Sequence, residues 1–159
     1  MNIEFTLNGK PVSVNVPPHK RLVDILREEQ KLQKTRSFCY RGECGGCAVL
    51  VNFQLAQSCL LPAFKVRDTE VITLEGFEKT KDYQDIVQGF AAGSYYPCDQ
   101  CSGSRILAAH TLLETNSRPT LEEVADYMSF ITCTCSDFTS LYRGIQEAAR
   151  LREERSRGR

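Results

Sequence analysis

The chain has 159 residues, enough for one medium domain or two small ones, and 42% of them are hydrophobic, as in ordinary folded proteins. Twenty basic residues balance twenty acidic ones, so no net field attracts nucleic acid or an anionic membrane surface. No apolar run approaches the roughly 18 residues that a membrane span needs, and the segment from Met1 to Phe5 lacks the plan of a signal peptide. We therefore expect a cytoplasmic protein whose partners are neither nucleic acid nor membrane.

Strand and turn signals dominate the first part of the chain. Apolar residues alternate from Ile3 to Leu7 and again from Val12 to Val16, and Asn8-Gly9 between them is typical of a two-residue hairpin turn. The segment from Leu22 to Leu26 has the spacing of a short amphipathic helix. Further short apolar runs are found at Ala48 to Val51, Gln54 to Ala56 and Val71 to Leu74. This pattern predicts a small α+β domain over residues 1–76.

Helical spacing replaces the strand signals from about Asp82 onward. Three of the expected helices are marked by the apolar residues Ile86, Val87 and Phe90, by Ile106, Leu107 and Leu113, and by Leu141, Ile145, Ala148 and Ala149. Between the last two, Thr120 and Glu123 form a capping box, which satisfies two free N–H donors at the start of a helix. We predict a four-helix domain over residues 82–154. A polar linker from Glu75 to Lys81 should precede it, and a frayed, solvated helix end should follow from Arg150.

The first set of cysteines has the C-x4-C-x2-C...C spacing of a plant-type [2Fe-2S] ferredoxin. Its members are Cys39, Cys44, Cys47 and Cys59. Three of these thiolates must converge from one tightly wrapped loop. Gly42, Gly45 and Gly46 suit that loop, because glycine takes positive φ and lets N–H groups point at sulfur. Zinc is the alternative, although structural zinc sites usually use two C-x2-C pairs.

The second set joins a C-x2-C pair to a C-x-C pair and consists of Cys98, Cys101, Cys133 and Cys135. This spacing alone leaves zinc and an iron-sulfur cluster equally open. A thioredoxin-like redox pair at Cys98 and Cys101 is disfavoured, because no βαβ pattern surrounds it. Disulfides are disfavoured as well, because a reducing cytosol keeps thiols from pairing.

Taken together, the cysteines and their neighbours resemble the iron-sulfur subunit of the xanthine dehydrogenase family of molybdenum hydroxylases. The matching stretches are Gly42-Glu43-Cys44-Gly45-Gly46-Cys47, Ser58-Cys59-Leu60-Leu61-Pro62-Ala63, Thr73-Leu74-Glu75-Gly76, Cys98-x-x-Cys101 and Cys133-x-Cys135. The resemblance implies a β-grasp, ferredoxin-like domain that holds one [2Fe-2S] cluster. A four-helix domain that holds a second [2Fe-2S] cluster would follow it.

The resemblance also implies a role for the chain as an electron-transfer subunit of a molybdenum-flavin hydroxylase. Substrate, with xanthine or another purine as the first expectation, would be oxidised on a molybdopterin-binding large subunit. Electrons would pass through the helical-domain cluster and then the β-grasp cluster to FAD on a medium subunit. No catalytic acid, base or nucleophile is visible in this chain, so the reaction would belong to a partner. The alternatives are a stand-alone two-cluster ferredoxin and a structural double zinc-binding module.

Two stretches near the second set depart from the family pattern. Pro97 and Asp99 flank Cys98 where the family usually has Gln and Gly, Gln100 replaces a Phe, and Thr134 lies between two cysteines where the family has Arg. Pro97 has no side-chain donor, so it cannot reproduce the pterin contact that the Gln makes in relatives. Asp99 adds a negative charge and Thr134 lacks a positive one, so we expect a lowered reduction potential at this cluster.

Overall fold

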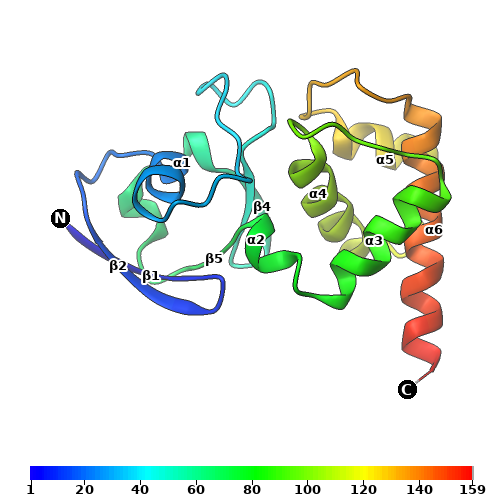
Figure 1. The fold of residues 1–159 in the computed structure, drawn as a ribbon, viewed down its shortest axis with the longest axis horizontal. Helices are drawn as coiled ribbons and strands as arrows, with labels where there is room; N and C mark the ends of the chain where they lie inside the picture. The colour runs from blue at the N-terminus through cyan, green and yellow to red at the C-terminus, as the bar shows by residue number, and fades with distance from the viewer. Residues whose placement is uncertain (159) are drawn as a thin grey trace. The chain divides into compact units, whose positions relative to one another are not determined.

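The structure is a computed structural model that describes residues 1–158. The chain divides into two compact units, one spanning Met1–Phe77 and the other beginning at Glu78 (Figure 1). Within the described residues, every strand of the sheet belongs to the first unit, and the helices α3 to α6 form the second. The expected order, a ferredoxin-like α+β region followed by a helical region, is therefore confirmed.

A five-stranded mixed sheet in the order β2-β1-β5-β3-β4 organises the first unit. Strands β1 (Asn2–Leu7) and β2 (Lys10–Asn15) form the predicted antiparallel hairpin, and β1 also pairs in parallel with β5 (Glu70–Ile72). Strand β3 (Ala48–Val51) runs antiparallel to both β5 and β4 (Gln54–Gln57). Asn8 and Gly9 have φ values of 51° and 78°, which are the positive angles that a tight type I′ turn requires.

The predicted amphipathic helix packs its apolar side into the core of this unit. It begins as α1 (Leu22–Asp24) and continues as a π-helical turn, η1 (Ile25–Glu29). Its buried residues join inward-facing residues of the strands and of the 3₁₀ turn η3 (Ala63–Val66) in one cluster. The members of that cluster are Ile3, Phe5, Leu7, Val14, Val16, Leu22, Ile25, Leu26, Val49, Ala63, Val66 and Val71.

The sequence predicted an apolar run from Val71 to Leu74 followed directly by a linker from Glu75. This detail is wrong, because a short helix, α2 (Leu74–Phe77), occupies the end of the run and the start of the linker. The Asn8 side chain accepts from the Thr73 N–H and donates to the Thr73 hydroxyl, at 2.9 and 3.0 Å. Gly76 lies so close to Asn8 that a Cβ there would approach Asn8 Oδ1 to 2.2 Å. These contacts attach α2 to the hairpin turn and explain why the segment is ordered.

The second unit consists of α3 (Lys81–Ala92), α4 (Ser102–Thr115), α5 (Leu121–Met128) and α6 (Phe138–Arg157). The capping box predicted at Thr120 and Glu123 is present at the start of α5. Ile86, Leu107 and Ile145 are fully buried, as the periodicity of three different helices predicted. The four-helix expectation is thus confirmed for the described residues.

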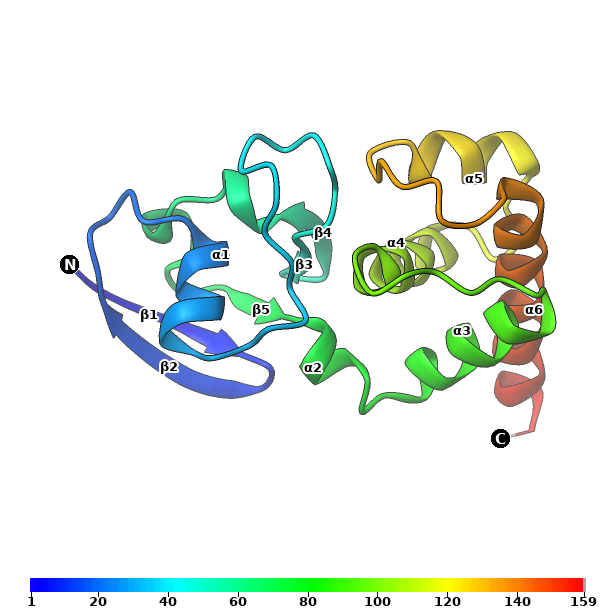
Figure 2. The same cartoon turned by 45° about the horizontal axis from the view of Figure 1, so that its top comes forward.

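Helices α3 and α6 pack at very close range in both views of the molecule (Figure 2). A Cβ built on Gly89 would lie 2.4 Å from the Ala148 nitrogen, and one built on Gly93 would lie 2.3 Å from the Gly144 nitrogen. Backbone therefore contacts backbone at these positions, and only glycine on α3 allows the helices to approach so far.

The end of α6 differs from the frayed, solvated tail that the sequence predicted. Arg155 binds Asp85 with a distance of 2.7 Å from Nε to Oδ2, and it also binds Asp82. Arg152 binds Glu114 on α4 and lies 3.6 Å from Asp82. Because these ion pairs are partly buried and share partners, they stabilise more than isolated surface pairs do, and the helix continues to Arg157.

We predict that Gly89→Ala lowers the free energy of unfolding by about 1 to 3 kcal/mol, because the added methyl group must push α3 away from the α6 backbone. This loss should exceed the gain of about 1 kcal/mol that alanine brings to a helix interior. The matched control is Gly158→Ala, where the new Cβ would meet its nearest neighbour at 3.7 Å and should leave stability within about 0.5 kcal/mol. Urea unfolding followed by circular dichroism measures both, and equal stabilities would contradict the close-packing argument.

Candidate metal centres

The loop that carries Cys39, Cys44 and Cys47 depends on residues with positive φ. Gly42 and Gly45 have φ values of 77° and 72°, as their assigned roles require, and Tyr40 has a φ of 54°. A Cβ on Gly42 would lie 2.6 Å from Leu60 Cδ1, so glycine is needed there for space as well. The expectation is wrong for Gly46, whose φ is not positive. Tyr40 was missed, because its residue type does not signal a left-handed conformation.

Backbone N–H groups point at the sulfur atoms of this loop. Arg41 N and Cys44 N each lie 3.4 Å from Cys39 Sγ, and Gly46 N lies 3.5 Å from Cys44 Sγ. The N–H groups of Arg41 and then Cys44 lower the pKa of the Cys39 thiol to about 6. The loop therefore favours the thiolate form, which is the form that binds metal.

The fourth cysteine of the first set comes from a separate segment of the chain. Cys59 lies in the 3₁₀ turn η2 (Ser58–Leu60) after β4, and its N–H is 3.4 Å from Cys47 Sγ. The Ser58 hydroxyl donates to the Cys47 carbonyl at 2.7 Å, which holds the two segments together. Cys47 and Cys59 are buried beside Val23, whereas Cys39 and Cys44 are half-buried. Burial raises the pKa of the Cys59 thiol to about 12, so this cysteine is held as a thiol until a metal displaces its proton.

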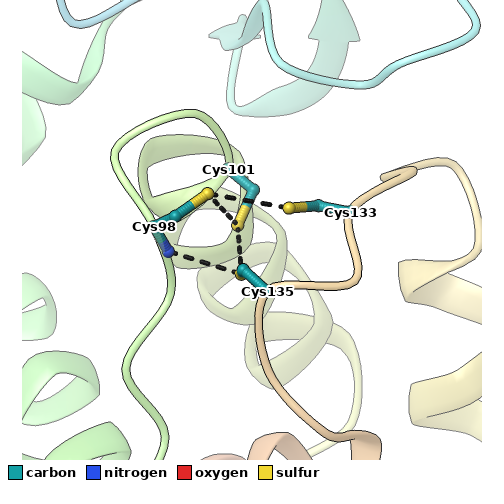
Figure 3. A group of neighbouring side chains, drawn as sticks. All are labelled: Cys98, Cys101, Cys133 and Cys135. Atoms are coloured by element: carbon teal, nitrogen blue, oxygen red, sulfur yellow. Dashed lines mark hydrogen bonds between the residues drawn. The ribbon is translucent and has the colours of Figure 1, made fainter.

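The second set converges on one point within the helical unit (Figure 3). Cys98 Sγ lies 3.8 Å from Cys101 Sγ and 3.6 Å from Cys133 Sγ, and Cys101 Sγ lies 3.5 Å from Cys135 Sγ. All four sulfur atoms are within 4.8 Å of one another. The fold thus brings together the two cysteine pairs that the sequence placed far apart.

Two different elements present these pairs. Cys101 is the N-cap of α4, and Ser102 N donates to the Cys98 carbonyl at 2.9 Å, so the first pair lies at the positive end of the helix dipole. Burial nevertheless raises the pKa of the Cys101 thiol well above its ordinary value. Cys133 and Cys135 lie in the loop between α5 and α6, and Cys98 N reaches across to Cys135 Sγ at 3.4 Å. Burial acts to raise the pKa of the Cys135 thiol, but the Cys98 N–H and the Ser136 hydroxyl outweigh it and bring that pKa to about 6.

The donor set of each centre fits a thiolate-bound metal group. Each offers four cysteines, and both zinc and [2Fe-2S] clusters are bound by four thiolates. In the second set, separations of 3.5 to 3.8 Å suit two thiolates on one metal ion, whether that ion is zinc or one iron of a cluster. The geometry of these four sulfur atoms therefore leaves the same two alternatives that their spacing in the sequence left.

The residues that depart from the family pattern lie at the surface of the helical unit. Asp99, Gln100 and Thr134 are exposed, and Pro97 is half-buried.

A further group, Asp82, His110 and Glu114, gathers within 4.8 Å, but Arg152 and Arg155 bind its carboxylates. The two carboxylates, from α3 and α4, and the two arginines of α6 form the ion-pair network that holds α6. This network was not visible in the sequence because its members come from three helices.

Two family models match the chain in succession. A model described as "2Fe-2S iron-sulfur cluster binding domain" matches residues 5–71, and one described as "[2Fe-2S] binding domain" matches residues 73–146. The chain therefore carries two iron-sulfur domains, and both matches favour [2Fe-2S] over zinc. Within residues 1–158 no helix is both long enough and apolar enough to traverse a lipid bilayer.

Similar proteins match over nearly the whole chain. The nicotinate dehydrogenase small FeS subunit of Eubacterium barkeri is 32% identical over 93% of this chain and 94% of its own length. The isoquinoline 1-oxidoreductase subunit alpha of Brevundimonas diminuta is 32% identical, with 93% and 97% covered. A probable xanthine dehydrogenase subunit of Bacillus subtilis is 28% identical, with 98% and 87% covered.

Solved structures show the same fold. Quinoline 2-oxidoreductase from Pseudomonas putida 86 superposes with a TM-score of 0.84 at 29% identity, covering 97% of this chain and 96% of that one. An aldehyde oxidoreductase from Desulfovibrio desulfuricans gives 0.84 at 26% identity, covering 96% of this chain but 17% of that one. With two iron-sulfur domains in the same order and relatives matched from end to end, the chain belongs to the family of small iron-sulfur subunits of the molybdenum hydroxylases, whose role is electron transfer within an oxidoreductase complex.

Proposed function

We propose that the two cysteine sets hold the two clusters of this subunit. Cys39, Cys44, Cys47 and Cys59 would bind one [2Fe-2S] cluster in a domain of residues 1–76, with Gly42, Gly45 and Gly46 lining it. Cys98, Cys101, Cys133 and Cys135 would bind the other in a domain of residues 82–154. The observation that carries this proposal is the gathering of four sulfur atoms within 4.8 Å in a segment that matches a [2Fe-2S] binding domain.

When bound, each cluster would accept and release one electron. The protein contributes the surroundings that make this reversible. N–H groups of Arg41, Cys44 and Gly46 point at sulfur in the first centre, and the N–H of Cys98 does so in the second. Such donors stabilise negative charge on sulfur and so favour the reduced state. Burial of Cys47, Cys59 and Cys101 keeps water away from part of each centre.

We further propose two partner chains, a large subunit with molybdopterin and a medium subunit with FAD. Electrons would pass from molybdenum to the helical-domain cluster, then to the β-grasp cluster and then to FAD. Relatives named as small or iron-sulfur-binding subunits support the existence of partners. A stand-alone two-cluster ferredoxin is the alternative, and purification of the native protein separates the two, because an obligate subunit copurifies with flavin and molybdopterin chains.

The substrate we propose is a nitrogen heterocycle, with purines such as xanthine as the first compounds to test. Relatives named for nicotinate, isoquinoline and xanthine support this class, although others are named for aldehydes. We place the complex in the cytoplasm, because eight free cysteines must remain reduced until the clusters assemble.

The native protein should contain about four irons and four labile sulfides per chain, because two complete sets of four cysteines each suit one [2Fe-2S] cluster. Metal and sulfide analysis of the complex isolated without air measures this. Stoichiometric zinc, or iron sufficient for one cluster alone, would contradict the two-cluster proposal.

Changing Cys44 to Ser should remove the electron paramagnetic resonance signal of the β-grasp cluster and stop flavin reduction by substrate. The helical-domain signal should remain, because its four cysteines lie in a separate compact unit. Cys101→Ser is the matched change and should have the reverse effect on the two signals. If either change abolishes both signals, the clusters do not assemble independently.

Asp99→Gly and Thr134→Arg should each raise the reduction potential of the helical-domain cluster and leave that of the other cluster unchanged. Removing a carboxylate and adding a guanidinium both favour an added electron. Both positions are exposed in this chain, so solvent and salt should weaken the effect unless a partner covers them. Redox titration of each variant with its partners is the measurement. Unchanged potentials in both would assign these residues to fitting the molybdenum subunit instead.

A further inference from the structure

Arg105 is a buried charged residue on α4, one helical turn after Cys101. It lies on α4 with 8% of its surface exposed, and within residues 1–158 no other Asp, Glu, Lys or Arg is buried to this degree. Its N–H donates to the Cys101 carbonyl at 2.9 Å, so its backbone belongs to the same helical turn that presents Cys101. A buried charge is costly unless something nearby offsets it, so its position calls for a physical reason.

The guanidinium of Arg105 contacts main-chain carbonyls and no carboxylate among the described residues. One terminal nitrogen is 3.5 Å from the Met128 oxygen and the other is 3.3 Å from the Ile131 oxygen. Met128 ends α5, and Ile131 begins the loop that leads to Cys133. Arg105 therefore links the helix that carries Cys98 and Cys101 to the segment that delivers Cys133 and Cys135.

The cysteine set would be the source of negative charge near Arg105 once it binds a cluster. The buried Tyr95 is affected by both Arg105 and the cysteines. Burial raises the pKa of the Tyr95 hydroxyl, Arg105 acts to lower that pKa, and Cys101, Cys135 and Cys133 act to raise it further. The guanidinium and three of the four sulfur atoms thus act on one phenol group. Two carbonyl dipoles do not neutralise a full charge, and the Arg105 Nε is buried without a hydrogen-bond partner.

We propose that Arg105 is a positioning residue for the helical-domain cluster and supplies the positive charge that stabilises the cluster in its reduced state. It fastens the loop of Cys133 and Cys135 to α4, and it offsets a cluster whose negative charge grows by one when an electron is added. The inference rests on the proposed assignment of the four cysteines as cluster ligands.

The charge on Arg105 should outweigh the two surface departures in this unit. Asp99 and Thr134 are exposed, whereas Arg105 is buried. Charges interact more strongly in the protein interior than in water, and buried charges are screened less by salt. We therefore expect Arg105 to offset part of the positive charge that relatives carry at position 134.

The test compares Arg105→Lys with Arg105→Gln in the complex purified with its partners. Both side chains are shorter than arginine and both carry a hydrogen-bond donor, but only lysine keeps the charge. We expect Arg105→Gln to lower the ratio of reduced to oxidised helical-domain cluster about tenfold at a fixed potential, which is about 59 mV for one electron. Arg105→Lys should stay within about twofold of wild type.

Two controls accompany the redox titration. The β-grasp cluster serves as an internal reference and should not shift in either variant. Arg150→Gln removes an exposed charge from α6, where Arg150 forms ion pairs with Glu147 and Glu154, and should leave both potentials unchanged.

Loss of the helical-domain cluster in the glutamine variant but not in the lysine variant would also support the proposal, because the two differ by one charge. Equal potentials in wild type, Arg105→Lys and Arg105→Gln would overturn it. Loss of the cluster in both variants would overturn the charge role, since only the bridge from the guanidinium to the two carbonyls would then matter. A wild-type complex without a second iron-sulfur signal would instead refute the ligand assignment, and metal analysis detects that case separately.

Discussion

The gathering of negative charge on closely spaced sulfur atoms is the constraint on which this structure depends. Sulfur atoms 3.5 to 3.8 Å apart repel one another once they are thiolates, and they are then stable only where donors, cations or a metal face them. The first unit meets this requirement with N–H groups of a wrapped loop around Cys39 and Cys44. The second meets it with the N-terminus of α4, the N–H of Cys98 and, by our proposal, the buried guanidinium of Arg105.

The two units provide their cysteines in different ways, and the rest of each unit follows from that difference. A loop that carries three of the cysteines uses positive φ at Gly42 and Gly45, and the buried core of the sheet and helix lies beneath it and beside Cys59. A centre built from two pairs that are distant in the chain depends on how the helices of its unit pack. Backbone contact at Gly89 and Gly93 joins α3 to α6, and the ion pairs of Arg152 and Arg155 join α6 to α3 and α4.

Electron transfer requires little of the chain beyond these arrangements. A subunit that moves electrons needs centres that change charge without rearranging, so its important residues are ligands, N–H donors and nearby charges. This agrees with the absence of a recognisable acid, base or nucleophile from the sequence. Differences between relatives would then be found in residues such as Asp99, Thr134 and Arg105, which can shift a potential while the ligands stay the same.

Local patterns in the sequence determined the hairpin at Asn8-Gly9, the capping box at Thr120 and the first cysteine set, because each depends on residues close together in the chain. Only the tertiary structure decided that Cys98 and Cys101 meet Cys133 and Cys135, that α2 replaces the expected linker, and that α6 continues to Arg157. Arg105 belongs to the same group, since an arginine among apolar helix residues does not reveal whether it faces solvent or carbonyls. These features depend on contacts between segments far apart in the chain, and such contacts exist only after the helices have packed.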